Sequence, residues 1–300
     1  ESHRLTDSVR GATKSLRSNQ TNAEATETDG LQSFDSDGFT VGTQGSMNKS
    51  NGDKFVGWSW LAGGSASSNS DGSITSTVSA NTTAGFSIVS YTGSGSSGAT
   101  VGHGLGVKPD IIITKSRVTA DNWGVYQTDL GATKGLYLNT TNAGFTASGL
   151  WNNTEPTSSI VTLGDNAATN DSGNMIMYCF HSVSGYSKFG SYTGNNNANG
   201  PFVYTGFKPA FTILKRTDSS DNWLIHDNKR KNPFNVVDTQ LFTDLNYAES
   251  SSSAILDYCA NGFKIRKTGG NINASGGTYI YLAFAESPFV NSNGVPTNAR

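Results

Sequence analysis

The chain has 300 residues, of which 15% are charged, and its formal net charge at neutral pH is -2. This balance excludes the basic footprint of a nucleic-acid-binding domain, and no apolar stretch is long enough to form a membrane-spanning helix. The 35 glycines, accompanied by many Ser, Thr and Asn residues, instead indicate a protein rich in β-strands and turns.

Most of the chain consists of repeats of one module. The stretch from Lys108 to Trp123, with its Lys-Pro, Ile-rich and Asp-Asn-Trp segments, returns from Lys208 to Trp223. A third, partial copy begins the chain, because residues 11–23 match residues 131–143. In that register Glu1-Ser2-His3 falls where Asp121-Asn122-Trp123 lies. A period of this length predicts repeated domains and not a solenoid.

The repeat divides the chain as follows. Residues 1–62 are a partial β module corresponding to its C-terminal half, and residues 63–84 form a Gly/Ser/Thr-rich linker, in which the β-branched segment 74–78 favours an edge strand as an alternative. Residues 85–184 and 185–290 are complete modules, and residues 291–300 are a tail. Because residue 1 lies within a module, we expect further chain before it. We also expect an upstream segment or a neighbouring subunit to supply the strands that the first module lacks.

Alternation of large and small side chains predicts the strand that closes each module, at residues 55–60, 175–180 and 279–284. Residues 111–114 and 211–214 are apolar on both faces, which predicts a central strand led in by a proline. Shorter strands are predicted at 86–91, 123–126, 135–139, 161–163, 223–226, 236–242 and 263–266, and a helical turn at 248–256 alone. This pattern predicts an all-β fold of tandem β-sandwich or jelly-roll-like modules.

Six residues are candidates for ligand binding. Trp123 and Trp223 follow Asp-Asn turns and could stack on sugars, although each shares a strand face with an aliphatic residue, which favours a place in the core. Lys215, Arg216, Lys229 and Arg230 form the main basic concentration. They could meet an anionic polysaccharide or phosphate, and the alternative is an ordinary solvated loop.

We expect no cofactor, no metal and no catalytic site. The four histidines lack metal-ligand spacing, and the Asp/Asn-rich run 165–171 lacks the order of a calcium loop. The glycine loop 102–106 precedes a strand, whereas a phosphate-binding loop follows one. The sequence gives no way to pair Glu155, Glu249 and Glu286 as glycosidase carboxylates. Cys179 and Cys259 have no repeat partners, so a disulfide is not expected.

The blocks 81–93, 101–110, 187–194, 200–211 and 274–286 resemble a family of modular, tail-fibre-like virion proteins of marine bacteriophages, which often carry lectin-like sandwich domains upstream. The resemblance implies a virion location and supplies no catalytic or binding residue. We therefore expect a virion structural protein, most simply a tail fibre or host-recognition appendage that binds by multivalency. The alternatives are a depolymerase acting on host surface glycan and a purely structural collar or head-decoration protein.

The expected partners follow from this hypothesis. They are identical chains in a homo-oligomer, for which three is the expected number, other virion tail proteins, and a host surface polysaccharide or outer-membrane receptor. Nucleic acid is not expected as a partner.

Overall fold

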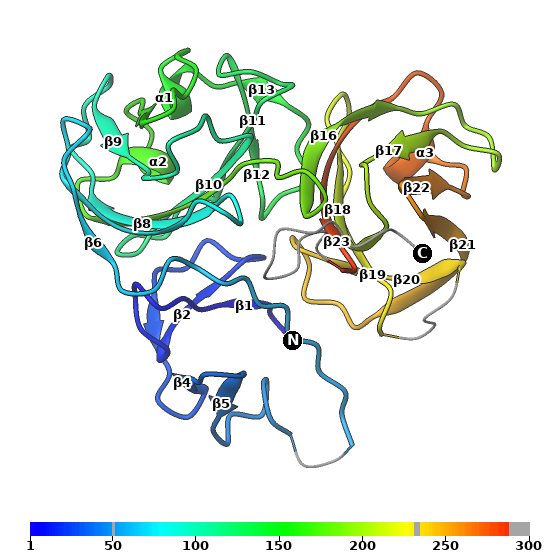
Figure 1. The fold of residues 1–300 in the computed structure, drawn as a ribbon, viewed down its shortest axis with the longest axis horizontal. Helices are drawn as coiled ribbons and strands as arrows, with labels where there is room; N and C mark the ends of the chain where they lie inside the picture. The colour runs from blue at the N-terminus through cyan, green and yellow to red at the C-terminus, as the bar shows by residue number, and fades with distance from the viewer. Residues whose placement is uncertain (50–51, 231–234, 288–300) are drawn as a thin grey trace.

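A computed structural model describes residues 1–49, 52–230 and 235–287, so the predicted tail 291–300 lies outside the described residues. The described chain is built almost wholly from β-strands, and the predicted all-β fold is confirmed. Three bodies are visible in Figure 1: a small first module and two larger modules, each with an eight-stranded sheet. No described helix is long and apolar enough to cross a membrane.

The second module is a curved eight-stranded sheet with a two-stranded sheet opposite it. In spatial order the large sheet contains β13 (Phe145–Thr146), β12 (Lys134–Tyr137), β11 (Gly124–Gln127), β10 (Ile111–Ser116), β15 (Asn174–Phe180), β8 (Phe86–Thr92), β7 (Ser76–Asn81) and β6 (Ser67–Asn69). The small sheet pairs β9 (Thr100–Gly102) with β14 (Ile160–Thr162). Two one-turn helices, α1 (Ser148–Trp151) and α2 (Ala167–Asn170), complete the module.

The third module joins all its strands into one curled sheet. Their order is β16 (Ser187–Thr193), β23 (Thr278–Ala285), β18 (Pro209–Arg216), β19 (Trp223–Asp227), β20 (Val237–Phe242), β21 (Ser250–Cys259), β22 (Gly262–Ile265) and β17 (Phe202–Tyr204). A single helical turn, α3 (Gly270–Asn273), lies before β23. The helical turn predicted at 248–256 is wrong, because residues 250–256 lie in β21, which pairs with β20 and β22.

The two large modules repeat one another in register. Ile111 lies opposite Phe180 in the second module, and Phe211 lies opposite Phe284 in the third. A fully buried asparagine also recurs: the side-chain amide of Asn170 holds the loop after β8, and that of Asn273 holds the loop after β16. The predicted correspondence of Ile111 with Phe211 and of Phe180 with Phe284 is therefore observed in the strand pairing.

Residues 63–84 are not the flexible linker that their composition suggests. β6 and β7 within them pair with each other, and β7 pairs along its whole length with β8. The alternative is right that a strand forms here, but its place at an edge is wrong. Residues 76–78 pair with β8 on one side and with β6 on the other, and β6 is the edge of the sheet. Backbone hydrogen bonds to a neighbouring strand need no apolar side chain, so a Ser/Thr-rich segment can extend a sheet.

The first module contains two small sheets, β1 (Arg4–Leu5), β2 (Lys14–Arg17) and β3 (Ala25–Thr26), and β4 (Leu31–Phe34) with β5 (Phe39–Val41). The closing strand predicted at 55–60 is wrong, because these residues belong to no described strand. They have no partners like those that flank β15 and β23. The rings of Trp58 and Trp60 instead lie 5.2 and 5.5 Å from the ring of Phe211 in the third module.

The three modules close into a triangle through equivalent backbone contacts (Figure 1). The amide of Asp121 donates to Thr21 in the first module at 2.9 Å, and the amide of Asp221 donates to Thr141 in the second at 2.8 Å. The amino group of Glu1 donates to Asn246 in the third at 3.1 Å. Glu1, Asp121 and Asp221 are equivalent in the repeat, so the contacts follow an approximate threefold symmetry within one chain.

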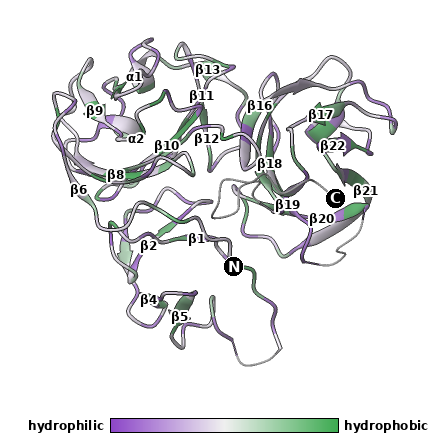
Figure 2. Cartoon of the chain, in the orientation of Figure 1, coloured by the Kyte–Doolittle hydropathy of each residue, from purple (hydrophilic) through white to green (hydrophobic). Residues whose placement is uncertain are grey.

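Apolar packing reinforces this arrangement. Each large module has its own core, and two further clusters lie where the modules meet. One of them combines Leu16 of the first module, Trp123 of the second, and Trp223 and Ile280 of the third. Hydrophobic residues follow the strands of both large sheets in Figure 2. Each large sheet therefore buries one face in the core of its own module and the opposite face against neighbouring modules.

Candidate functional site

The two candidate tryptophans lie between modules and not on the surface. Trp123 is 0% exposed and Trp223 is 1% exposed. The indole nitrogen of Trp123 donates to the carbonyl of Arg17 at 3.0 Å, and that of Trp223 donates to the carbonyl of Tyr137 at 3.0 Å. The hypothesis that these two tryptophans stack on sugars is therefore wrong, and their interpretation as core residues is confirmed.

Lys215 and Arg230 are also held within the protein. Lys215 Nζ donates to the carbonyls of Asp221 at 2.7 Å and of Thr141 at 3.1 Å, which ties the third module to the second. Burial lowers the pKa of Lys215 to about 8. Arg230 is bound by Asp227 at 2.6 Å and by Glu249 at 2.8 Å. Neither cation is available to a surface ligand, so both are corrected from candidate ligand-binding residues to structural ones.

Arg216 and Lys229 remain nearer the surface. Arg216 makes a two-pronged ion pair with Asp218 at 2.9 and 3.0 Å, and its side chain is 18% exposed. Lys229 is 72% exposed and its Nζ lies 3.5 Å from Glu286. Of the six candidate residues, Lys215 and Trp223 are cross-strand neighbours. The four basic residues do not form one surface, because the side chains of Lys215 and Arg230 are buried.

Arg230 belongs to a repeated arrangement that sequence reasoning missed. Asp227 accepts hydrogen bonds from the amides of Lys229 and Arg230, as Asp7 does from Val9 and Arg10 in the first module. Gln127 makes the equivalent turn in the second module. The signal was present as Asp-x-x-Arg at positions 7–10 and 227–230, in equivalent places of the repeat.

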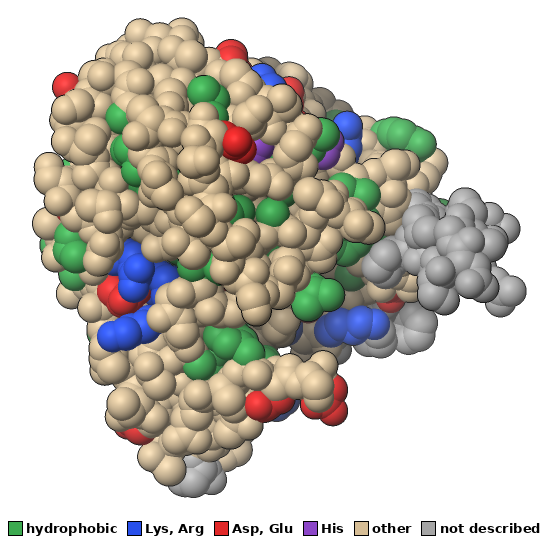
Figure 3. All heavy atoms as spheres, turned by 60° about the vertical axis from the view of Figure 1, so that its left-hand side comes forward, with side chains coloured by type: hydrophobic (Ala, Val, Ile, Leu, Met, Phe, Trp, Pro, Cys, Tyr) green, Lys and Arg blue, Asp and Glu red, His purple; other side chains and the backbone are tan. Residues whose placement is uncertain are grey.

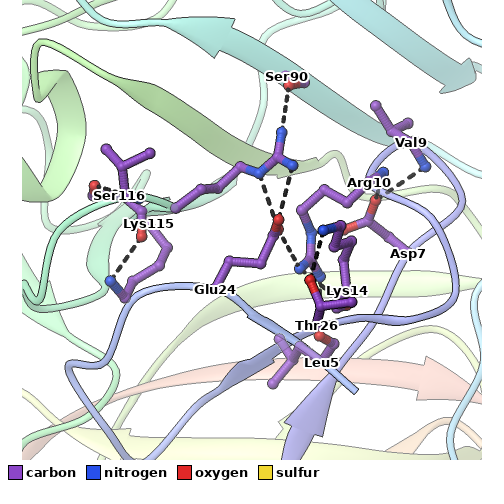
Figure 4. Close-up of polar contacts among 12 residues, drawn as sticks. Leu5, Asp7, Val9, Arg10, Lys14, Glu24, Thr26, Ser90, Lys115 and Ser116 are labelled. Carbon is purple, nitrogen blue, oxygen red and sulfur yellow. Dashed lines mark hydrogen bonds and ion pairs between the residues drawn. The ribbon is translucent and has the colours of Figure 1, made fainter. Parts of the chain in front are cut away.

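A buried ionic network joins the first and second modules (Figure 4). Arg117 donates a hydrogen bond to each of the two carboxylate oxygens of Glu24, both at 2.9 Å. Arg10 donates to one of the same oxygens at 3.1 Å. These two arginines hold the pKa of Glu24 below its usual value even though burial alone would raise it. Arg10 also donates to the hydroxyl of Tyr178. Charges in this network are satisfied by one another, which suits a structural role.

The carboxylates considered for catalysis lie in separate structural contacts. Glu155 is bound by Lys108 and by the amide of Ala132. Glu286 is bound by Lys208, and Glu249 by Arg230 as described above. In the run 165–171, Asn166 caps α2 and Asp171 accepts hydrogen bonds from two hydroxyl groups. Within the described ranges, no three His, Cys, Asp or Glu side chains gather as metal ligands.

The surface residues that stand out are aromatic rings that sequence reasoning did not single out. Phe202 and Tyr204 on β17 are 46% and 66% exposed. They lie two residues apart on an edge strand, so both side chains point to the same side of the sheet. The face drawn in Figure 3 is mostly polar or backbone atoms with hydrophobic side chains in small separate groups. Exposed rings also pair across β4 and β5 of the first module, where Phe34 and Phe39 are each 45% exposed. Tyr204 is the most exposed of these four rings, and the Phe202 and Tyr204 pair is a candidate to contact a ligand.

No curated protein and no solved structure matches the chain. A family model with the description "Domain of unknown function (DUF7483)" matches residues 1–288. This match covers nearly all of the sequence, including all three modules, and the chain therefore belongs to that family.

Proposed function

We propose that this protein is a structural protein of a bacteriophage virion, most simply part of a tail fibre or another host-recognition appendage. The observation that carries the proposal is the closed triangle of modules, in which the contact of Asp121 with Thr21 recurs as Asp221 with Thr141 and as Glu1 with Asn246. In a chain built this way the modules surround one approximate threefold axis, and their outward loops and edge strands are presented around it. The resemblance of its sequence blocks to tail-fibre-like virion proteins supports the same function.

The placement of the charged residues favours this function over a depolymerase. A glycosidase needs two carboxylates facing a common substrate. Glu155, Glu249 and Glu286 are each committed to a lysine or arginine partner instead. Arginines and acids are used here to fix turns and module contacts, as a structural protein requires.

In this proposal the chain binds a host surface polysaccharide or an outer-membrane receptor, and it attaches to other virion tail proteins. We also propose that it forms a homo-oligomer, with three chains as the expected number, because several weak sites on one particle raise the avidity. Analytical ultracentrifugation of the purified chain tests the oligomer: a single species with three times the chain mass is expected, and a monomer at all concentrations would contradict it.

Immunogold electron microscopy tests the location. Particles of a phage whose genome encodes this chain are labelled with antibody raised against residues 85–287, after mass spectrometry has detected the chain in purified particles. Gold at the tail or its fibres is the expected result. Gold on the head would favour the decoration-protein alternative, and absence of the chain from particles would refute a virion role.

A further inference from the structure

The aromatic pair on β17 lies on an unusual piece of surface. The ring of Phe202 leans along the strand over Gly262, because a Cβ placed on that glycine would lie 2.8 Å from its ring tip. Tyr204 leans in the same direction, with its hydroxyl 3.6 Å from a Cβ placed on Gly206. Each ring therefore rests beside a residue without a side chain. The two rings form a strip along the strand, with much of their area open to solvent.

Polar groups border this strip on the same face of the sheet. Phe202 pairs across the strands with Lys264, which in turn pairs with Asp257. Tyr204 pairs with Gly262. Arg266 continues the row of Lys264, is 41% exposed, and lies 3.5 Å from Asp257. The Nζ of Lys264 also donates to the carbonyl of Gly200 at 2.9 Å. Two cations and one carboxylate thus stand beside the rings, and the cations outnumber the carboxylate.

The second module shows that this surface is particular to the third. Thr100 and Gly102 on β9 occupy the positions of Phe202 and Tyr204, because Val101 and Val203 are the buried residues between them. There the turn between β6 and β7 covers the strand. A Cβ on Gly102 would lie 1.8 Å from Asn69, and the amide of Ser73 donates to the Thr100 hydroxyl at 2.8 Å.

Among its described residues the third module has no counterpart of that turn over β17, because β16 follows β15 after a short connection. Large side chains therefore fit on β17, whereas the turn leaves no room for them at the equivalent positions of β9. Burying Phe202 and Tyr204 would have been the simple outcome for rings at an open edge. They are instead left exposed side by side along the strand, and contiguous exposed apolar surface is typical of a binding site.

We propose that Phe202 and Tyr204, with Lys264 and Arg266, bind an acidic polysaccharide. This inference rests on the proposed function and names the ligand class for its host-binding surface. The apolar faces of successive sugar rings would stack on the two aromatic rings. The two cations would meet carboxylates on the sugars, and Asp257 would accept hydrogen bonds from hydroxyl groups. A long polymer suits a strip that is open at both ends.

Isothermal titration calorimetry with tetragalacturonate tests the site, with neutral maltotetraose as the comparison ligand. The wild-type chain is expected to bind the acidic tetrasaccharide more tightly than the neutral one. The double variant Phe202→Ala/Tyr204→Ala should bind at least roughly tenfold more weakly. Lys264→Gln should weaken binding of the acidic ligand and leave binding of the neutral one unchanged.

Tyr247→Ala is the matched control, because Tyr247 is 62% exposed and lies outside the strip. It should bind as the wild type does. Since all substituted side chains are exposed or half-buried, thermal unfolding should be unchanged and loss of binding cannot be attributed to misfolding. Equal binding by wild type and double variant, no measurable binding of tetragalacturonate by the wild type, or no preference for the acidic ligand would each overturn the proposal. These outcomes are independent of the immunogold result, so failure of the site and failure of the virion function are distinguishable.

Discussion

His226 makes the stability of the third module sensitive to acid. Its side chain is fully buried on β19, and neither ring nitrogen has a hydrogen-bond partner among the described residues. Burial lowers the pKa of His226 from 6.5 to about 3. Between those values the unfolded chain binds a proton that the folded chain does not, so the free energy of unfolding falls as the pH falls. The stabilisation is complete above pH 6.5 and is lost progressively toward pH 3.

The size of the effect follows from the width of that window. Within this window the free energy of unfolding falls by about 1.4 kcal/mol for each pH unit. Lowering the pH from 6.5 to 4.5 therefore lowers it by about 2.7 kcal/mol. Asp244 acts in the opposite direction, because burial raises its pKa from 3.8 to about 6 and the folded chain then takes up the proton first. The contribution of His226 is therefore measured as a difference between two proteins.

The substitution His226→Phe keeps an aromatic ring where the second module has Tyr126, and it removes the titrating group. Denaturant unfolding followed by tryptophan fluorescence at pH 7 and pH 4.5 gives the free energy for each protein. The wild type should lose about 2–3 kcal/mol more than the variant over this range. Ile265→Val in the same core is the control, with a loss of about 0.5–1.5 kcal/mol that is the same at both pH values. Parallel pH profiles for wild type and His226→Phe would refute the reasoning.

Three further predictions concern the contacts between modules, and each is measured by denaturant unfolding. Trp223→Phe removes the indole donor from the buried carbonyl of Tyr137 and should cost about 1–3 kcal/mol; an unchanged midpoint would contradict the contact. Between pH 8 and pH 10 the unfolded chain holds a proton that the folded Lys215 has lost, so stability should rise by up to about 2.7 kcal/mol from this residue, and Lys215→Met should show a shallower rise. Glu24→Gln leaves two arginines without their shared carboxylate and should cost about 3 kcal/mol, whereas a variant as stable as wild type would show that the network is dispensable.

The sequence by itself determined the repeat and the strands at its centre. Ile111 and Phe211 were predictable because their neighbours alternate in the same way and the preceding Lys-Pro marks the start of each strand. These signals are local, since side-chain direction along a strand depends on residue parity alone. The same parity placed Trp123 and Trp223 with core residues. Parity could not show that Trp123 and Trp223 are buried between modules and not inside one module.

Pairing partners were decided only by the tertiary structure. Residues 76–81 look like a linker because few of their side chains are apolar, yet β8 offers them a complete row of backbone partners. Residues 55–60 show the opposite case. Their alternation matches that of β15 and β23, but no strand in the described part of the chain pairs with them. A strand exists only when another backbone completes its hydrogen bonds, and that depends on distant parts of the chain.

The exposed rings have the same explanation. Strand pairing gives Phe202 and Tyr204 the places that Thr100 and Gly102 occupy in the second module, a register that differs from the hundred-residue spacing of the sequence repeat. Whether the larger side chains are covered depends on the turn at residues 69–73 between β6 and β7 of the second module, which has no counterpart in the described part of the third. Parity along a strand determines which side chains share a face. The packing of elements far apart in sequence determines which face meets water, and here it leaves the aromatic strip of the third module open.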